Sequence, residues 1–285
     1  MKTIMKKVSC LLALLLLVAT MFADISLADD VKPVEKPTGE VAVSALSAYI
    51  WRGQEMTRNS VVVQPSATIS YKGFTFNAWG NLDTKPYSAA NANYAGKHTE
   101  TDFTLSYSKK FGILTVTPGY IYYALGAPNT GAAVPLDSQE VFLTLGLDTI
   151  LSPTLTAYKE IDHYHQWYFL LGVSHTFALH EKVGLKLAAT ASYLASNDEN
   201  TYARYNSNAV ATTDKYNNFH DATVSISLPV AVTKSLTLTP TASYVFPLCD
   251  DAKYEMKGRG LQGVTSPTDR NSSFLYGGVA LSFAF

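Results

Sequence analysis

Charged residues are scarce in this chain of 285 residues. They make up 16% of the sequence, against about a quarter in an ordinary soluble domain. Beyond position 28 there is no run of about twenty apolar residues, as a membrane-spanning helix would need, and no segment shows a helical period. The 18 Tyr and 13 Phe argue against disorder. Such a chain is expected to face lipid through alternating residues.

The chain also has few cysteines and no excess of positive charge. Once the first 28 residues are removed, 19 basic and 22 acidic residues remain, without a basic run or patch. Nucleic acid is therefore not an expected partner. Cys249 is then the single cysteine left, so an intrachain disulfide is excluded. We expect Cys249 to be a small apolar residue near a loop.

The N-terminus has the layout of an export signal. Three lysines lie within the first seven residues, the apolar run Val8–Val18 follows, and Ser26-Leu27-Ala28 places small residues before Asp29. This pattern predicts a cleavable signal peptide over residues 1–28. Residues 29–40 hold two Pro and six charges. We expect them to form a flexible periplasmic tether, because this composition buries little surface.

From residue 41 to the end the dominant period is two. In Leu236–Phe246 every second residue is apolar, and most of the residues between are Thr or Ser. Such alternation predicts strands with one apolar and one polar face. Most of the segments are long enough to cross a membrane as tilted strands of about 9–11 residues. The twelve segments lie near 41–52, 60–71, 74–83, 99–109, 113–124, 137–147, 153–161, 166–178, 183–196, 219–229, 236–247 and 273–285.

The connections between these segments alternate in length. Short ones such as Lys72-Gly73 alternate with mostly longer ones such as Asn197–Asn218 and Leu248–Ser272, and Asp162–His165 departs from the pattern. The sequence therefore predicts an all-β fold, an antiparallel up-and-down barrel of about 12 strands over residues 41–285 that spans the outer membrane, with both termini periplasmic. A secreted β-sandwich is disfavoured, because the polar face is mostly Thr, Ser, Gly and Asn and carries little charge.

The last segment alternates up to a terminal aromatic residue. Phe283 and Phe285 end a run of apolar residues at every second position. This ending resembles the C-terminal signal read by the barrel assembly machinery of the outer membrane. We therefore expect Phe283 and Phe285 to form an assembly signal, with that machinery and outer-membrane lipid as partners.

The first three segments resemble a known family. Ser47–Gln54 contains a Tyr-x-x-Arg-Gly corner, Val63-Gln-Pro65 follows, and Tyr71–Gly80 is a strand bearing a Trp. With these motifs the chain is similar to the TorF family of porins. The resemblance implies an outer-membrane β-barrel that acts as a passive channel, and it supplies no catalytic residue, cofactor or solute.

Polar side chains are expected to point into the barrel when the apolar face points outward. Six acids and two bases fall on this inner face, which predicts a preference for cations. Arg52 either binds anionic solutes or braces the wall by pairing with an acid such as Glu140 or Glu160, and bracing is favoured. Glu100 and Asp102 either attract cations or pair with Lys186 and Arg52. The predicted lumen residues are Arg52, Asp83, Glu100, Asp102, Glu140, Glu160, Lys186 and Asp221.

A barrel of this size is expected to leave a narrow passage. Eight strands leave an interior filled by side chains and about sixteen leave an aqueous channel. The sequence therefore predicts a porin-like channel for small hydrophilic solutes, which an inward-folded loop could close. A non-conducting structural or surface-binding barrel is the first alternative.

A lipid-modifying enzyme with a Ser–His pair is the second alternative. No nucleophile-elbow motif is present, and the His-x-His pair in a predicted loop has no evident third and fourth metal ligands. We therefore expect no catalytic residue, metal site or cofactor. The histidines considered for such a pair are His163, His165, His175, His180 and His220.

Overall fold

The chain forms a closed antiparallel barrel of twelve strands. A computed structural model describes residues 36–285 except 59, 86–95, 128–134, 262–265 and 267–268. The predicted signal peptide and most of the predicted tether lie outside the described residues. The barrel strands are β1 (Thr38–Leu46), β4 (Val62–Tyr71), β5 (Phe74–Asp83), β6 (Lys97–Tyr107), β8 (Leu114–Leu125), β9 (Ser138–Leu147), β10 (Thr154–Glu160), β11 (Gln166–His180), β12 (Val183–Ser196), β15 (Asn217–Ser227), β17 (Leu236–Pro247) and β18 (Phe274–Ala284).

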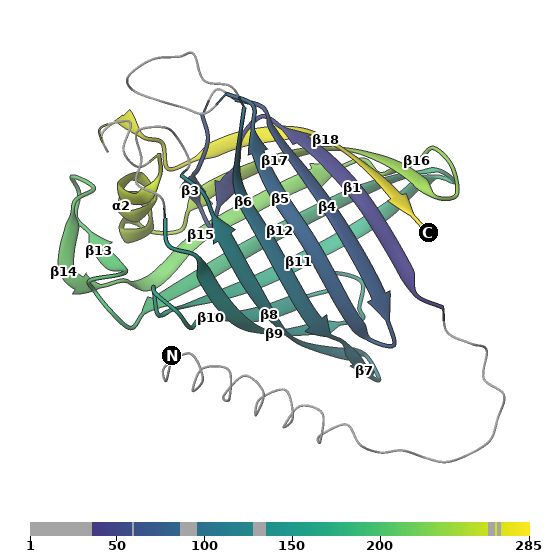
Figure 1. Ribbon diagram of the computed structural model, residues 1–285, viewed down its shortest axis with the longest axis horizontal. Coiled ribbons are helices and arrows are strands. Elements are labelled where there is room, and N and C mark those ends of the chain that lie inside the picture. The colour runs from purple at the N-terminus through teal and green to yellow at the C-terminus, as the bar shows by residue number, and fades with distance from the viewer. Residues whose placement is uncertain (1–35, 59, 86–95, 128–134, 262–265, 267–268) are drawn as a thin grey trace. The chain divides into compact units, whose positions relative to one another are not determined.

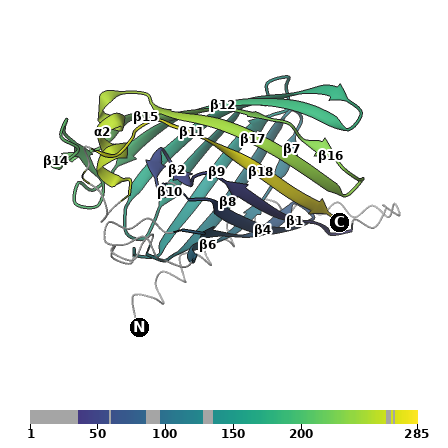
Figure 2. The ribbon, with the colours of Figure 1, turned by 90° about the horizontal axis from the view of Figure 1, so that it is seen from above.

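Each barrel strand pairs with its neighbours in the chain, and β1 pairs with β18 to close the barrel. In that seam Glu40 lies opposite Ala284 and Leu46 opposite Gly278. Phe285 continues the seam, because its N–H donates to the carbonyl of Gly39 and its own carbonyl accepts from the Gly39 N–H. Figure 2 shows β12, β15 and β17 on one side of the barrel and β4 and β6 on the other.

The two faces of the wall follow the alternation of the sequence. Many outward side chains are apolar and exposed, as in Val41, Val43, Phe103, Leu105 and Leu281. Such a surface is suited to lipid and not to water. The inward residues toward the short turns are mostly Thr and Ser, and they bond across strands. Ser70 lies 2.9 Å from Thr75, and Thr144 lies 2.8 Å from Thr156, between side-chain oxygens.

Short turns join the strands at one end of the barrel. Lys72 and Gly73 both have positive φ angles, of 50° and 85°, as a two-residue hairpin turn requires. The short strands β7 (Lys109–Phe111) and β16 (Val230–Ala231) lie at this end, which we call the turn end, together with the C-terminus (Figure 1). The opposite end, called the loop end, carries the longer connections. The predicted alternation of short and long connections is confirmed.

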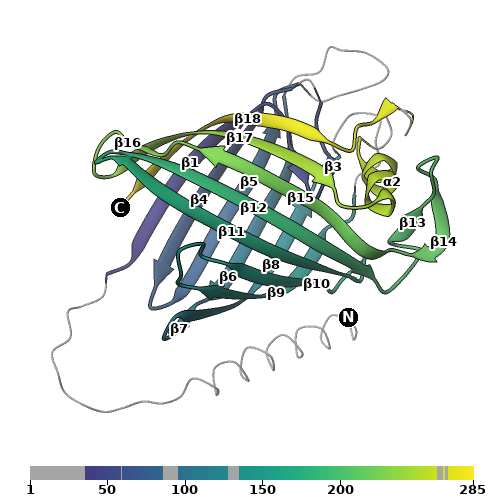
Figure 3. The ribbon, with the colours of Figure 1, turned by 180° about the vertical axis from the view of Figure 1, so that it is seen from behind.

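Elements of the longer connections lie at the loop end. They are β2 (Ile50–Trp51), β3 (Gln54–Glu55), β13 (Ala203–Tyr205), β14 (Ala211–Lys215) and the helix α2 (Asp250–Arg259). Figure 3 shows α2 and the β13–β14 hairpin together at this end. No helix of the described residues is long and apolar enough to cross a membrane.

Two predictions about chain segments need correction. The first segment was expected to run over 41–52, but β1 begins at Thr38 and ends at Leu46, after which the chain turns into the β2–β3 hairpin. Arg52 and Gly53 form that turn with positive φ angles of 46° and 76°, which a continuous strand does not allow. The helix α2 was not expected, because its helical signals lie at its two ends and not in an apolar period.

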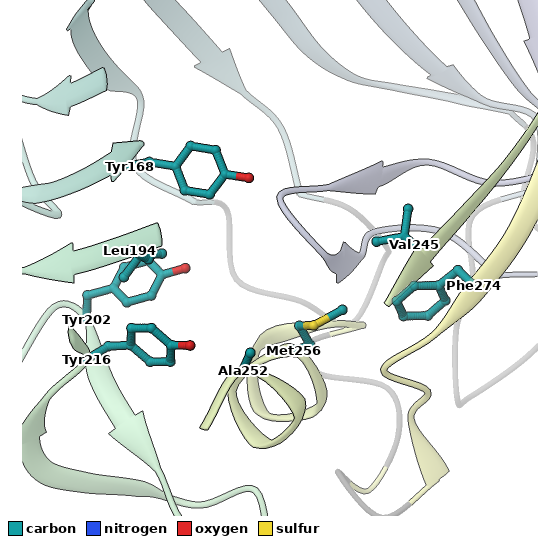
Figure 4. Packing of buried hydrophobic residues seen from close by; sticks show 8 residues of the cluster. All are labelled: Tyr168, Leu194, Tyr202, Tyr216, Val245, Ala252, Met256 and Phe274. Carbon is teal, nitrogen blue, oxygen red and sulfur yellow. The ribbon is translucent and has the colours of Figure 1, made fainter. Parts of the chain in front are cut away.

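A hydrophobic core fills part of the barrel at the loop end. Figure 4 shows Ala252 and Met256 of α2 between tyrosines on one side and Val245 and Phe274 on the other. Tyr168 and Leu194 come from neighbouring strands of the wall and occupy the same core. These contacts place the helix against the inner face of the barrel. The buried members are Tyr168, Leu194, Tyr202, Tyr216, Val245, Ala252, Met256 and Phe274.

Candidate functional site

The candidate site is the inner loop end of the barrel, where loop segments meet the wall. Cys249 is the N-cap of helix α2, and its Sγ accepts a hydrogen bond from the N–H of Ala252. Acidic residues occupy its first turn and basic residues its last turn, as the helix dipole favours. Its buried residues are Ala252, Glu255 and Met256, so α2 brings a carboxylate together with its apolar face into the barrel.

Arg52 of the β2–β3 hairpin reaches across to the wall and pairs with Glu140 of β9. Its two terminal nitrogens lie 2.8 and 2.6 Å from the two carboxylate oxygens. The side chains of Arg52 and Glu140 are 9% and 2% exposed, so the pair is shielded from water. The hydroxyl of Tyr123 donates to the same carboxylate at 2.9 Å. Pairing of Arg52 with Glu140, the favoured interpretation, is therefore confirmed.

Aromatic rings surround the guanidinium group of Arg52. Its central carbon lies 4.4 Å from the ring centre of Tyr168, 4.7 Å from that of Trp51 and 5.0 Å from that of Tyr158. Contacts at this distance are attractive for a cation. Burial alone would lower the pKa of Arg52, but Glu140 more than compensates and the pKa is raised above its usual value. Arg52 is therefore permanently charged in this position.

Tyr49 anchors the same loop on a different sector of the wall. Its hydroxyl donates to Glu100 of β6 at 2.9 Å, and its ring lies 5.7 Å from that of Trp79, between centres. Burial, and then the neighbouring Glu100, raise the pKa of Tyr49 well above its usual value, so the phenol remains a donor. Tyr49 and Arg52 thus attach the first loop to β6 and β9, two strands of the wall that are separated by β8.

Glu100 and Asp102 lie on the inner face of β6, and of the two interpretations left open for them, pairing with Lys186 and Arg52 is not seen in the described residues. The Oδ1 atom of Asp102 is buried and has no hydrogen-bond partner in the part of the chain that the structure describes. Unlike Glu140, which pairs with Arg52, these two acids have no cationic partner in the described part of the chain.

His220 links the wall to α2. Its Nδ1 lies 2.9 Å from Asp221 and its Nε2 lies 2.7 Å from Glu255 of the helix. Asp221 also accepts hydrogen bonds from Tyr168 and Ser192 at 2.9 and 2.8 Å. A bulge causes this arrangement, because the pairs Ala191–Ala222 and Tyr193–Phe219 leave an extra residue on β15. Two consecutive residues, His220 and Asp221, are consequently both buried.

Glu255 connects α2 to the first loop and to the loop before β15. Gln54 of β3 donates to Glu255 at 2.9 Å and to the hydroxyl of Tyr202 at 2.8 Å. Arg259 lies 3.3 Å from Glu255 and its guanidinium covers the ring of Tyr202 at 3.6 Å. Three separate loop segments are thereby joined to each other inside the mouth of the barrel.

Glu160 organises a short loop. The backbone N–H groups of residues 162–165 all donate to its carboxylate, at 2.7 to 3.1 Å. Ser138 adds a further bond at 3.1 Å. Glu160 is fully buried, so it serves as the centre of the turn between β10 and β11 and not as a free charge facing the lumen.

Asp83 and Lys186 lie in different surroundings. Asp83 is buried and accepts hydrogen bonds from the Ser60 hydroxyl and from the backbone N–H of Lys85. Lys186 shares its face of β12 with the buried Ser192 and Leu194, so it points inward, and it is exposed. An exposed charge on the inner face near the turn end indicates water there. The predicted lumen residues thus divide into a group at the loop end, most of whose members are bonded, and Lys186 toward the turn end.

The assembly-signal residues and the remaining histidines lie elsewhere. Phe283 and Phe285 are exposed on the outer face, with ring centres 6.3 Å apart. His163 lies beside Asp162, and His175 contacts the carbonyl of Ile150. His220 is buried among carboxylates, where it has no access to the lipid face. No group of three or more metal-binding side chains occurs among the described residues.

Sequence reasoning missed the loop residues of this site. Alternation assigns a face to a residue inside a strand, and Gln54, Tyr202, Glu255 and Arg259 lie outside the barrel strands. Glu255 offered no signal of its own. The sequence His220-Asp221 did offer one, because two adjacent polar residues interrupt a period of two at the start of an otherwise regular strand.

Comparison with known proteins supports the barrel. No protein-family model and no curated protein sequence matches the chain. Among solved structures, the NanC porin is similar over 86% of this chain and 98% of its own, with 10% identity and a TM-score of 0.50. The KdgM porin is similar over 87% of this chain and 99% of its own, with 10% identity and a TM-score of 0.48. An outer-membrane channel from Pseudomonas putida F1 is similar over 92% of this chain and 100% of its own, with 9% identity and a TM-score of 0.46. At such identity the NanC likeness shows the fold alone, and membership in the TorF family stays a prediction.

Proposed function

We propose that this protein is a porin-like channel of the outer membrane that lets small hydrophilic solutes pass without energy input. The observation that carries the proposal is the exposed, charged Lys186 on an inner face that is mostly Thr, Ser and small residues toward the turn end. Short side chains of this kind cannot fill a barrel wider than eight strands. Water therefore enters the turn-end half of the barrel.

The loop end limits what can pass. Arg52, Tyr49 and α2 occupy the mouth and are bonded to the wall. Since this half is packed with side chains, the proposed solutes are small, and bulky oligomers are excluded. The proposal includes the outer membrane as the location, with both termini periplasmic and the loop end outside the cell.

The proposal also includes a preference for cations. Arg52 neutralises Glu140, and His220 lies between Asp221 and Glu255. Glu100 and Asp102 have no such cationic partner among the described residues. These two acids are the residues proposed to concentrate cations in the passage.

Single-channel recording in planar bilayers tests the function. Purified protein is expected to give discrete conductance steps, and a variant with residues 249–260 replaced by a short Gly-Ser linker is expected to give larger ones. Heat-modifiable migration of both proteins confirms that each barrel is folded. If neither folded protein conducts, the channel proposal is wrong.

The packed core at the loop end favours a second candidate function, a non-conducting barrel whose loops bind a partner. Tyr202, Tyr216 and Met256 are almost completely buried in this core. Such packing is expected of a barrel whose mouth stays closed to solutes. Absence of conductance in the folded linker variant would support this candidate. Conductance that is present in the linker variant but absent in the parent would indicate a channel that must be opened.

A further inference from the structure

The wall residues around Arg52 form a complete receptor for a guanidinium group. We define the guanidinium cage as Tyr123, Glu140, Tyr158 and Tyr168, which come from the neighbouring strands β8, β9, β10 and β11. Arg52 is not part of this wall; it enters from the β2–β3 hairpin. The guest and its receptor therefore belong to different structural parts, a loop hairpin and the barrel wall.

The contacts match a planar, forked cation. Glu140 receives two parallel N–H bonds, at 2.8 and 2.6 Å, which is the bidentate geometry that a guanidinium offers and an ammonium does not. Tyr158 and Tyr168 present their rings to the cation at 5.0 and 4.4 Å. Tyr123 fixes the carboxylate through its hydroxyl at 2.9 Å.

The cage needs a cation. Glu140 is buried, and a buried carboxylate without a counter-charge is strongly unfavourable. The guest is held in a backbone conformation that side chains with a β-carbon rarely adopt, since Arg52 has a φ of 46°. Without Arg52, the cage would hold an unpaired buried carboxylate beside the open ring faces of Tyr158 and Tyr168.

We propose that the guanidinium cage is a binding site for small organic cations that carry a guanidinium group, and that Arg52 occupies it as an internal ligand. A tethered group acts at an effective concentration in the millimolar range or above. Free cations therefore compete poorly while Arg52 is in place and bind once it has left. That these cations are solutes of the channel rests on the proposed function, whereas their binding does not.

Removal of the Arg52 side chain exposes the site to a matching probe. Arg52→Ala deletes the atoms that ethylguanidinium contains, and Arg52→Gly does so in a residue that accepts the positive φ. We expect millimolar ethylguanidinium to raise the thermal unfolding midpoint of both variants in detergent, and to leave the parent unchanged. Arg204→Ala is the matched control, because it removes an arginine from an exposed pair with Asp214 and leaves the cage filled.

Two further probes and one further variant identify the receptor. Ethylammonium carries a positive charge but lacks the two parallel N–H donors of a guanidinium group. Ethylurea is planar but uncharged. Both are therefore expected to bind at least tenfold more weakly than ethylguanidinium. Adding Glu140→Gln to Arg52→Ala is expected to weaken ethylguanidinium binding at least tenfold. The proposal is wrong if the folded single variants do not respond, if ethylurea acts equally well, or if Glu140→Gln has no effect.

If Arg52→Ala folds poorly, its refolding yield replaces the thermal unfolding midpoint as the measurement. Ethylguanidinium in the refolding buffer is then expected to raise the yield of heat-modifiable barrel, and an unchanged yield contradicts the proposal. Conductance separates the two proposals from each other. Binding without conductance in any variant overturns the channel and keeps the cage, and conductance without binding does the reverse.

Discussion

The Nε2 atom of His220 lies 2.7 Å from Oε2 of Glu255, and this contact joins the barrel wall to the helix in its mouth. Nδ1 of the same ring lies 2.9 Å from Asp221. An ionised carboxylate only accepts hydrogen bonds, so both ring nitrogens must carry a proton. The ring and both carboxylates are buried, which makes His220 the charged centre of the contact between wall and helix.

Loss of His220 should therefore weaken the packing of α2. His220→Ala leaves two buried carboxylates without their shared cation, a change that costs about 3–5 kcal/mol in comparable sites. We expect a lower free energy of unfolding in detergent and faster proteolysis within α2. His175→Ala is the matched control, since that ring contacts a carbonyl near the turn end. Equal stability of the two variants would show that His220 does not hold the helix.

Glu160 should keep the short connection between β10 and β11 at the loop end ordered. Glu160→Gln keeps the shape of the side chain but removes the charge that four backbone N–H groups share. Hydrogen bonds to charged groups contribute about 1.5–3 kcal/mol each, so we expect much faster amide hydrogen exchange at residues 162–165. Glu181→Gln, at an exposed position in a turn, should leave that exchange unchanged. Unaltered exchange in Glu160→Gln would contradict this role.

The strands were predictable, and the interior of the loop end was not. Alternation in Leu236–Phe246 matches β17 (Leu236–Pro247) closely, because a strand with one apolar face requires a period of two. The same rule extended the first strand through Arg52, where the chain in fact turns inward. A hairpin that folds into a barrel is held by contacts such as Arg52–Glu140, which are 88 residues apart, and local sequence does not encode them.

The predicted lumen acids illustrate the same limit. Alternation placed Glu140 and Asp221 on the inner face and offered Glu140 as a partner for Arg52, but it gave no partner for Asp221. The partner of Glu140, Arg52, lies in a loop, and the charged partner of Asp221 is His220, which a bulge adds to the inner face. Helix α2 was also missed, since Cys249 at its N-cap and the charges at its ends are weak signals without an apolar stripe.

The C-terminal residue should matter for assembly and not for export. Phe285 forms two backbone hydrogen bonds with Gly39 across the closing seam, and its ring covers Gly39. Phe285→Asp puts a charge on the outer face next to Phe283, so we expect less heat-modifiable protein in the outer membrane with signal cleavage intact. Glu40→Asp is a conservative control in the same seam. A normal yield from Phe285→Asp would show that the terminal aromatic residue is dispensable.

The surface exposed to the outside should be the loop end. A tag inserted between Ser207 and Asn208, at the exposed tip of the β13–β14 hairpin, is expected to be labelled on intact cells, because long loops face outward in barrels of this kind. A tag at Lys72-Gly73 is expected to be labelled only after the outer membrane is permeabilised. This hairpin is preferable to Leu248–Ser272 as an insertion site, since α2 is packed inside the mouth. The reverse labelling pattern would invert the proposed orientation.

Selectivity should depend on Glu100 and Asp102 more than on the other inner acids. Charges interact over about 8 Å at physiological salt, and in a narrow passage an unpaired acid raises the local concentration of cations. Glu140, Asp221 and Glu160 contribute less, because Arg52, His220 and backbone N–H groups already offset them.

Reversal potentials in a salt gradient measure this preference. The parent channel should favour cations, and Glu100→Gln with Asp102→Asn should lower the cation-to-anion permeability ratio several-fold. Glu199→Gln with Asp214→Asn removes the same number of charges from exposed ion pairs around the β13–β14 hairpin, and it should change the ratio little because bulk water screens those positions. If the two double variants shift the reversal potential equally, the net charge of the protein sets the selectivity, and the assignment of Glu100 and Asp102 to the passage is wrong.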